Sequence, residues 1–260
     1  NEVYIIDKND ALGLQTEVTY FTLPDTDYPG LVRRVRFKNT GKKALELEVL
    51  DGLAQLEPYG VDDWALKMQG RNLEGWMNVY NLDEDAGMPW FKLSASFKDA
   101  AEVNEIVEGN FALAWIEGEE GEGALPQVVD PAIVFGADTS LLKADVFDRH
   151  ASLAELLALE QTTASRTPCS FAAKALSLKP GESVVINSVF GHAYHVKQFV
   201  DEIAPQLMTA GFLNKAYATA SKLTEDITDV VDTKTGSAVF DAYVRQMQLD
   251  NLLRGGYPLI

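Results

Sequence analysis

The chain has 260 residues, of which 47% are apolar, 10% aromatic and 23% charged. This composition excludes a disordered tail, a fibrous repeat and a small protein stapled by disulfides. Because 39 Asp and Glu outnumber 22 Lys and Arg, the formal net charge is −17, which repels phosphate backbones and anionic lipid surfaces. We therefore expect a folded protein that binds neither nucleic acid nor membranes.

The cysteine and histidine content argues against disulfides and metal. Cys169, the one cysteine, lies in an apolar stretch and is interpreted as core filler. A metal site would need a third ligand beside His192 and His195, and none can be placed, so no metal is predicted. No window approaches the roughly 18 apolar residues of a spanning helix, and the N-terminus lacks the layout of a signal peptide. We expect a cytoplasmic protein, since reducing compartments keep thiols free.

Residues 1 to 193 are predicted to form mainly strands, because apolar residues recur there with a period of two between Gly, Pro, Asn and Asp. Clear alternations run from Leu12 to Tyr20, from Leu31 to Phe37 and from Leu45 to Val49. The segment Asn39-Thr40-Gly41-Lys42 predicts a hairpin-type turn, since Asn and Gly tolerate a positive φ. Further strands are expected at 76–81, 90–97, 111–117, 170–178 and 184–190. Such a series of antiparallel strands is typical of a large sandwich.

Helices are expected inside and after this β region. Two short ones interrupt it at 61–69 and 153–161, the second with Ser152 as its N-cap and Glu155 three residues later. After His195 the apolar spacing changes to three and four, which predicts helices over 196–208, 212–231 and 237–253. The last helix carries an apolar side made of Phe240, Tyr243, Val244, Met247 and Leu252.

Carboxylates and aromatic rings are the candidate functional groups. Glycoside chemistry uses paired carboxylates, and Asp62-Asp63 is one such pair in this sequence. With 39 acids, however, such neighbours also arise on solvated loops, so no residue is assigned as catalytic. Trp64 opens a helix and is the candidate for an exposed sugar-binding ring. Trp90 and Trp115 fall in strand patterns and are expected in the core. His192 and His195 are interpreted as an ordinary strand-end pair.

Two regions of the chain resemble the inverting glycoside phosphorylases related to cellobiose phosphorylase, and most closely the branch that acts on β-1,3-linked oligoglucans. The first runs from Leu31-Val32-Arg33-Arg34-Val35-Arg36-Phe37 through Asn39-Thr40-Gly41 and Leu45–Leu50 to Glu57-Pro58-Tyr59-Gly60. The second comprises Phe240-Asp241-Ala242-Tyr243 and Leu249-Asp250-Asn251-Leu252-Leu253-Arg254-Gly255-Gly256-Tyr257-Pro258. The likeness follows the order of the family over most of the chain, and the second region is the more specific.

The resemblance implies a mainly β fold. It predicts a large antiparallel β-supersandwich, galactose-mutarotase-like, over 1–195 with short inserted helices, a helical linker over 196–232, and over 233–260 the first helix of a truncated (α/α)6 catalytic barrel. In the family an acid in the barrel protonates the glycosidic oxygen while inorganic phosphate, a co-substrate and no cofactor, attacks the anomeric carbon. That acid would lie beyond residue 260, so this chain by itself is expected to be inactive.

The resemblance also implies roles and partners. Arg254 and Tyr257 match the loop where the family's barrel approaches the sugar, so together with Trp64 they are predicted to bind substrate. The alternative for Arg254 is a plain ion pair with Asp250 at i and i+4. An oligosaccharide is the expected substrate, and a homodimer through the sandwich is a further expectation.

Two other functions stay open on the sequence. One is a free-standing carbohydrate-binding or structural β-sandwich with a helical tail. The other is a related glycoside hydrolase or polysaccharide-processing enzyme with the same layout. Asn1 in place of Met, and the apolar Leu259-Ile260 after Gly-Gly-Tyr-Pro, lead us to expect a piece of a longer protein.

Overall fold

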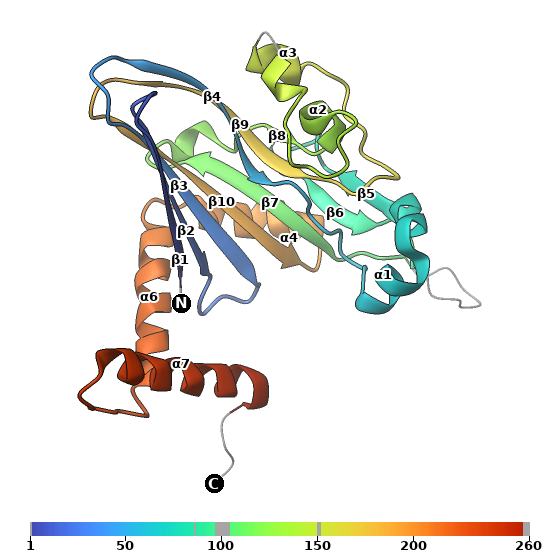
Figure 1. Cartoon of the computed structure of the whole chain (residues 1–260). Coiled ribbons are helices and arrows are strands. Elements are labelled where there is room, and N and C mark those ends of the chain that lie inside the picture. The colour runs from blue at the N-terminus through green and yellow to red at the C-terminus, as the bar shows by residue number, and fades with distance from the viewer. Residues whose placement is uncertain (1, 86, 97–104, 150–151, 257–260) are drawn as a thin grey trace.

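Two antiparallel sheets pack face to face in the computed structural model, which describes residues 2–85, 87–96, 105–149 and 152–256 (Figure 1). The larger sheet has seven strands, in the spatial order β1 (Val3–Asn9), β2 (Leu14–Thr22), β3 (Gly30–Asn39), β10 (Ser183–Ala193), β7 (Gly109–Ile116), β6 (Trp90–Leu93) and β5 (Met77–Tyr80). The smaller has three, in the order β4 (Leu45–Leu53), β9 (Ser170–Leu178) and β8 (Gln127–Val128). The predicted mainly β sandwich is confirmed.

The helices are short within the sandwich and longer after it. Those inside the β region are α1 (Asp63–Gln69), the 3-10 turn η1 (Gly70–Trp76), the 3-10 turn η2 (Glu120–Glu122), α2 (Pro131–Phe135), the 3-10 turn η3 (Phe147–Arg149) and α3 (Leu153–Leu157). Those after it are α4 (Val196–Gln198), the π-helical η4 (Phe199–Ile203), α5 (Ala204–Leu207), α6 (Phe212–Thr228) and α7 (Ala238–Gly255). Each predicted helix is present, and Ser152 caps α3 as expected, its side chain accepting from the Glu155 amide. The short α2 and the strand β1 were not predicted.

Alternation along β3 assigns its side chains to the two faces of the large sheet. Val32 belongs to the core beneath the C-terminal helices, whereas Val35 and Phe37 belong to the core shared with the small sheet. Strand β10 pairs with both β3 and β7 and carries the same alternation across the middle of the sheet. We call the first surface the helix face and the second the sheet face.

The turn after β3 corrects one prediction. Asn39 to Lys42 does not close a hairpin, because β3 lies in the large sheet and β4 in the small one. The buried Asn39 amide holds the crossing in place: its Nδ2 donates to Lys43 O and Leu178 O, both at 2.8 Å, and its Oδ1 accepts from Gly41 N at 2.9 Å. In the sequence alone, an Asn that binds a distant segment looks the same as an Asn that forms a local turn.

Large rings close the helix face. Phe199 stacks on Phe111 with ring centroids 4.4 Å apart and lies parallel to Trp90 at 6.3 Å. Trp90 and Trp115 are buried, as predicted. Gly109 makes room for Trp90, since a Cβ there would lie 2.2 Å from an indole carbon. Helices α4 to α6 are thus held against the sheet by close-packed aromatic surface.

Polar contacts hold the small sheet against the sheet face of the large one. Arg33 of β3 reaches Asp51 of β4 at 2.6 Å and also binds the Tyr20 hydroxyl. Burial by itself lowers the pKa of Arg33, but the hydrogen bond and charge of Asp51 outweigh it and raise that pKa.

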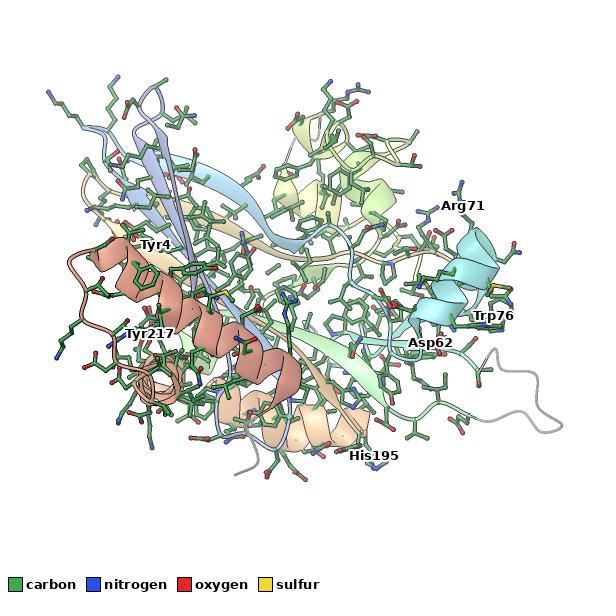
Figure 2. All side chains as sticks on the ribbon, turned by 60° about the horizontal axis from the view of Figure 1, so that its bottom comes forward. Tyr4, Asp62, Arg71, Trp76, His195 and Tyr217 are labelled. Atoms are coloured by element: carbon green, nitrogen blue, oxygen red, sulfur yellow. The ribbon has the colours of Figure 1, made fainter. Side chains whose placement is uncertain are left out.

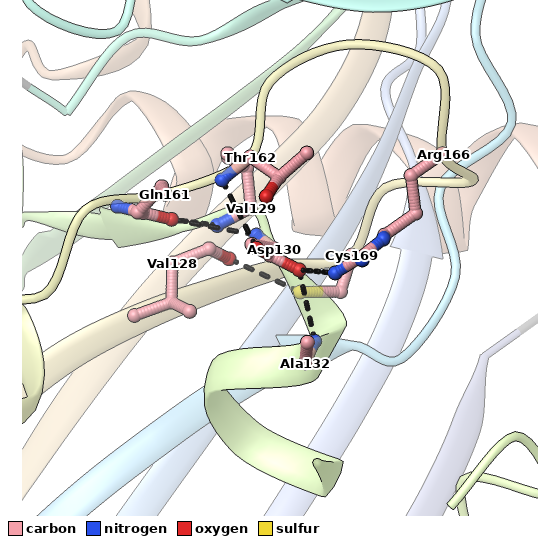
Figure 3. Close-up of polar contacts among 8 residues, drawn as sticks. All are labelled: Val128, Val129, Asp130, Ala132, Gln161, Thr162, Arg166 and Cys169. Atoms are coloured by element: carbon pink, nitrogen blue, oxygen red, sulfur yellow. Dashed lines mark hydrogen bonds and ion pairs between the residues drawn. The ribbon is translucent and has the colours of Figure 1, made fainter. Parts of the chain in front are cut away.

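A second group of polar contacts lies beside the small sheet, where Asp130 caps α2 (Figure 3). Its carboxylate accepts from Ala132 N at 2.9 Å, Thr162 N at 3.0 Å and Arg166 Nη1 at 2.5 Å. Cys169 is buried next to it, in agreement with a core role, and burial raises the pKa of its thiol.

Helix α7 differs from α6, the other long helix, because none of its residues is buried, whereas α6 buries Leu213 and Ala216. Its predicted apolar side is largely exposed, including Phe240, Tyr243 and Met247. The helix itself was predicted correctly.

Candidate functional site

A depression lies on the sheet face where the strands of the large sheet extend past the small one. It consists of two adjoining pockets of about 420 and 390 Å³ that share Glu57 and Asn110. The larger has an apolar wall that includes Leu31, Leu56 and Phe190, and His192 lines it as well. The volumes fall at the lower end of the range for small-molecule sites.

Strand pairing positions the polar residues of this depression. His192 of β10 is directly opposite Asn110 of β7, so both side chains point to the sheet face. The segment before α1 is tied to β6, because Tyr59 N donates to Phe91 O at 3.1 Å and Leu93 N donates to Tyr59 O at 2.9 Å. The Asn110 amide then donates to Glu57 O at 2.8 Å. These bonds bring residues 57–60 to the ends of β7 and β10.

Tyr59, Glu108 and His192 form a compact cluster there. The Tyr59 and His192 rings stack with centroids 4.7 Å apart and an interplanar angle of 28°. His192 Nε2 lies 3.1 Å from Glu108 Oε2, and the Tyr59 hydroxyl also hydrogen-bonds Glu108. Tyr194 meets the His192 ring edge-on at 5.7 Å. One carboxylate therefore links a phenol and an imidazole whose rings are already stacked.

The local environment raises the pKa of two groups of the site, the Tyr59 phenol and the Glu57 carboxyl. Burial raises the pKa of Tyr59, and the hydrogen bond to Glu108 adds to that shift. Burial also raises the pKa of Glu57, with a further contribution from the negative charge of Asp63. The depression thus offers a phenol, carboxylates, an imidazole and an amide next to apolar side chains, a mixture that suits a ligand with hydroxyl groups and apolar ring faces.

A second groove, of about 800 Å³, lies across the sheet on the helix face. Its walls are Tyr80 and Lys92 from β5 and β6 and, opposite them, His195 at the start of α4 with Asp201 and Glu202 of η4. Lys92 Nζ lies 4.9 Å from the centre of the Tyr80 ring and donates to Ile106 O at 2.5 Å. The Lys92 ammonium therefore already lies over a face of the aromatic ring in this groove.

The sequence-predicted substrate residues lie on two different elements. Trp64 is on α1, 56% exposed as expected, and Asp62, which caps that helix, lines the smaller pocket. Arg254 is on α7, exposed, with its Nε 3.1 Å from Asp250 Oδ1. Tyr257 lies outside the described residues. Helices α1 and α7 lie apart in both views (Figures 1 and 2), so the structure does not bring Trp64 and Arg254 together.

The cluster of Tyr59 and His192 was not predicted as a site. The interpretation of His192 and His195 as a strand-end pair misses that the two line different pockets: His192 of β10 lines the depression, and His195, the residue before α4 (labelled in Figure 2), lines the helix-face groove. The alternation along β10 was the available signal for His192. Among the residues that the structure describes, no group of three or more His, Cys, Asp or Glu could hold a metal ion. In the same residues, no helix combines the length and apolarity required to cross a bilayer.

Comparison with known proteins gives likenesses to solved structures alone, and two of these are described. No family model and no curated protein sequence matches the chain. A polysaccharide lyase superposes with a TM-score of 0.38 and 11% identity over 80% of this chain and 23% of its own. A protein named as a kojibiose phosphorylase from human microbiome superposes with a TM-score of 0.24 and 9% identity over 97% of this chain and 25% of its own. By their names both act on carbohydrates, and this chain spans about a quarter of either.

Proposed function

We propose that this chain is the sandwich portion of a carbohydrate-active enzyme and that the depression on its sheet face binds a sugar. The observation that carries the proposal is the Tyr59, Glu108 and His192 cluster at the rim of a pocket with an apolar wall. Sugars present hydroxyl groups around an apolar ring face, and such a cluster can hydrogen-bond the first while Leu31 and Phe190 contact the second.

The finer part of the proposal is phosphorolysis of β-glucosidic oligosaccharides to a sugar 1-phosphate by a longer protein. Its support is the resemblance of residues 31–60 and 240–258 to the cellobiose phosphorylase group. In this proposal the described residues bind and shape the substrate entrance, and the proton donor for the glycosidic oxygen lies outside this chain. Phosphate-dependent release of glucose 1-phosphate by the longer protein would support it, and release of free sugar without phosphate would replace it by hydrolysis.

Arg254 has its own test in the longer protein. A guanidinium that donates to a sugar hydroxyl or to phosphate acts on turnover, so Arg254→Ala is expected to reduce kcat/KM at least about tenfold, with little change in stability. Unchanged kinetics would leave Arg254 only its ion pair with Asp250.

Sugar binding by the 260-residue chain is tested by isothermal titration with laminari- and cello-oligosaccharides. We expect Tyr59→Ala to weaken binding about tenfold, equivalent to about 1.4 kcal/mol. Tyr80→Ala removes the same side chain from the groove on the helix face and is the matched control, expected to leave affinity unchanged. Trp64→Ala tests whether the Trp64 ring, which the sequence predicts to bind substrate, contributes to the affinity.

Two results would contradict the binding proposal. Absence of heat with every oligosaccharide would leave the sandwich a supporting role only. Loss of binding in Tyr80→Ala with none in Tyr59→Ala would move the sugar to the helix-face groove. Binding by the chain, combined with a longer protein that turns over no sugar, would favour a binding module in place of an enzyme.

A further inference from the structure

The two edges of the seven-stranded sheet are finished differently. At the β5 edge the segment 163–165 covers the strand, since Val79 N donates to Thr163 O at 2.7 Å and Ser165 N donates to Met77 O at 2.9 Å. At the β1 edge, among the described residues, every backbone hydrogen bond of β1 belongs to its ladder with β2. The outer backbone groups of β1 are therefore free to pair with another strand.

The exposed side chains of β1 are unusual for such an edge. All seven residues are exposed, and the first four, Val3, Tyr4, Ile5 and Ile6, are apolar with 49% to 57% of their surface accessible. Natural edge strands are normally protected by Pro, by bulges, by inward charges or by a covering segment. An uncovered apolar edge of this length is expected to pair with another chain, so we propose that β1 pairs antiparallel with β1 of a second copy of this protein.

The register follows from symmetry and charge. A two-fold axis normal to the sheet makes the two strands antiparallel and places the helix face of one copy beside the helix face of the other. Two residues that oppose one another must therefore both be even-numbered or both be odd-numbered. With the axis at Ile5, the two Ile5 side chains meet, Tyr4 opposes Ile6, Val3 opposes Asp7 and Glu2 opposes Lys8. Aromatic with β-branched and opposite-charge pairs are both favourable across strands.

Neighbouring registers lack the opposite-charge pair. An axis at Ile6 sets Lys8 against Tyr4 and still places an apolar residue, Ile5, opposite Asp7, and an axis at Tyr4 sets Glu2 against Ile6. The axis at Ile5 is further favoured because the Tyr217 hydroxyl of α6 bonds Glu2 and holds that carboxylate on the helix face, where Lys8 also points. The net charge of −17 on each copy opposes association, but at 0.15 M salt it is screened beyond about 8 Å.

The proposal makes the position of the axis measurable by cross-linking. In this register the two copies of residue 5 have their Cα atoms about 4.5 to 5.5 Å apart, within disulfide reach, whereas the two copies of residue 3 are about 14 Å apart. We expect Ile5→Cys to form a covalent dimer on oxidation and Val3→Cys, on the same face and similarly exposed, to remain unlinked. Cys169 is buried and supplies no competing thiol.

Sedimentation equilibrium supplies the second measurement. Lys8→Glu replaces two favourable pairs by like charges and is expected to weaken dimerisation about tenfold. Lys67→Glu makes the same change in net charge on α1, beyond the other edge, and is expected to leave it within about twofold. A wild-type chain that stays monomeric at 100 μM would overturn the proposal, as would equal cross-linking of Val3→Cys and Ile5→Cys.

Discussion

The two faces of the seven-stranded sheet are closed in different ways. On the helix face, Phe111, Trp115 and Phe199 belong to one continuous apolar core with α4 to α6. On the sheet face, three strands cover only part of the surface, and the contacts include the Arg33 to Asp51 ion pair. Beyond the small sheet this face is left open, and the depression with His192 lies there.

Because of this difference, we expect the helix face to contribute mainly to stability and the sheet face to contribute mainly to ligand binding. Close-packed rings contribute apolar burial that does not depend on a polar partner, so the helix face can stabilise the fold. Charged and hydrogen-bonded groups contribute little net stability but fix geometry, and any that lack a partner are costly. The open part of the sheet face is therefore the better place for a ligand, and substitutions on the two faces should differ in size and in pH dependence.

The largest expected effect is on the helix face. Phe199→Ala removes a fully buried ring that stacks on Phe111 and should lower the free energy of unfolding by about 3 to 5 kcal/mol. Phe240→Ala makes the same change at a ring of α7 that is 51% exposed, and should cost less than about 1 kcal/mol. Urea unfolding measures both. Equal losses would mean that the aromatic core does not carry the stability of this face.

A smaller effect is expected at the ion pair of the sheet face. Arg33→Met leaves the buried Asp51 carboxylate without its cation and should lower the free energy of unfolding by about 2 to 4 kcal/mol. Arg36→Met, on the same strand, removes an exposed arginine 3.6 Å from Glu17 and should cost at most about 1 kcal/mol.

A double variant sharpens this second test. Replacing both Arg33 and Asp51 by apolar residues should recover most of the loss, because no unpaired charge remains. If the double variant were as unstable as Arg33→Met alone, the packing of the arginine stem would account for the effect in place of the charge.

The sequence predicted much of the fold because many elements carry their own pattern. Strand β9 was predicted with the observed bounds, and the start of α3 followed from its Ser152 cap. Strand β1 was not predicted, since Val3 to Ile6 form an unbroken apolar run without alternation. The sheet that each strand joins was also beyond local reasoning, because Asn39 is fixed by Leu178, a residue far along the chain.

The candidate site was harder to predict than the fold. Tyr59 and His192 are remote in sequence, and they stack only because β10 pairs with β7 while residues 57–60 bond to β6. The predicted site residues were chosen from the resemblance or from expected exposure, and Trp64 is indeed exposed. Their role in substrate binding stays a prediction.

The smallest effect concerns Asp130, and it depends on pH. Burial alone raises the pKa of Asp130, but the hydrogen bonds from Ala132, Thr162 and Arg166 outweigh it and lower that pKa below its ordinary value. The folded state therefore favours the charged carboxylate. Its contribution to stability is complete above the unfolded pKa of about 3.9 and is lost as the pH falls through the lower, folded value.

Asp130→Asn tests this sign directly. The variant should be about 1 to 2 kcal/mol less stable than the wild type at pH 7, and the deficit should persist to about pH 5 and shrink below about pH 4. Asp62→Asn makes the same change at the exposed cap of α1, where the side chain accepts from Ala65 N at 2.8 Å, and should stay close to the wild type throughout. Urea midpoints at several pH values measure both variants. A deficit for Asp130→Asn that stays constant down to pH 3 would show that shape and hydrogen bonding, not the carboxylate charge, hold this corner of the sheet face.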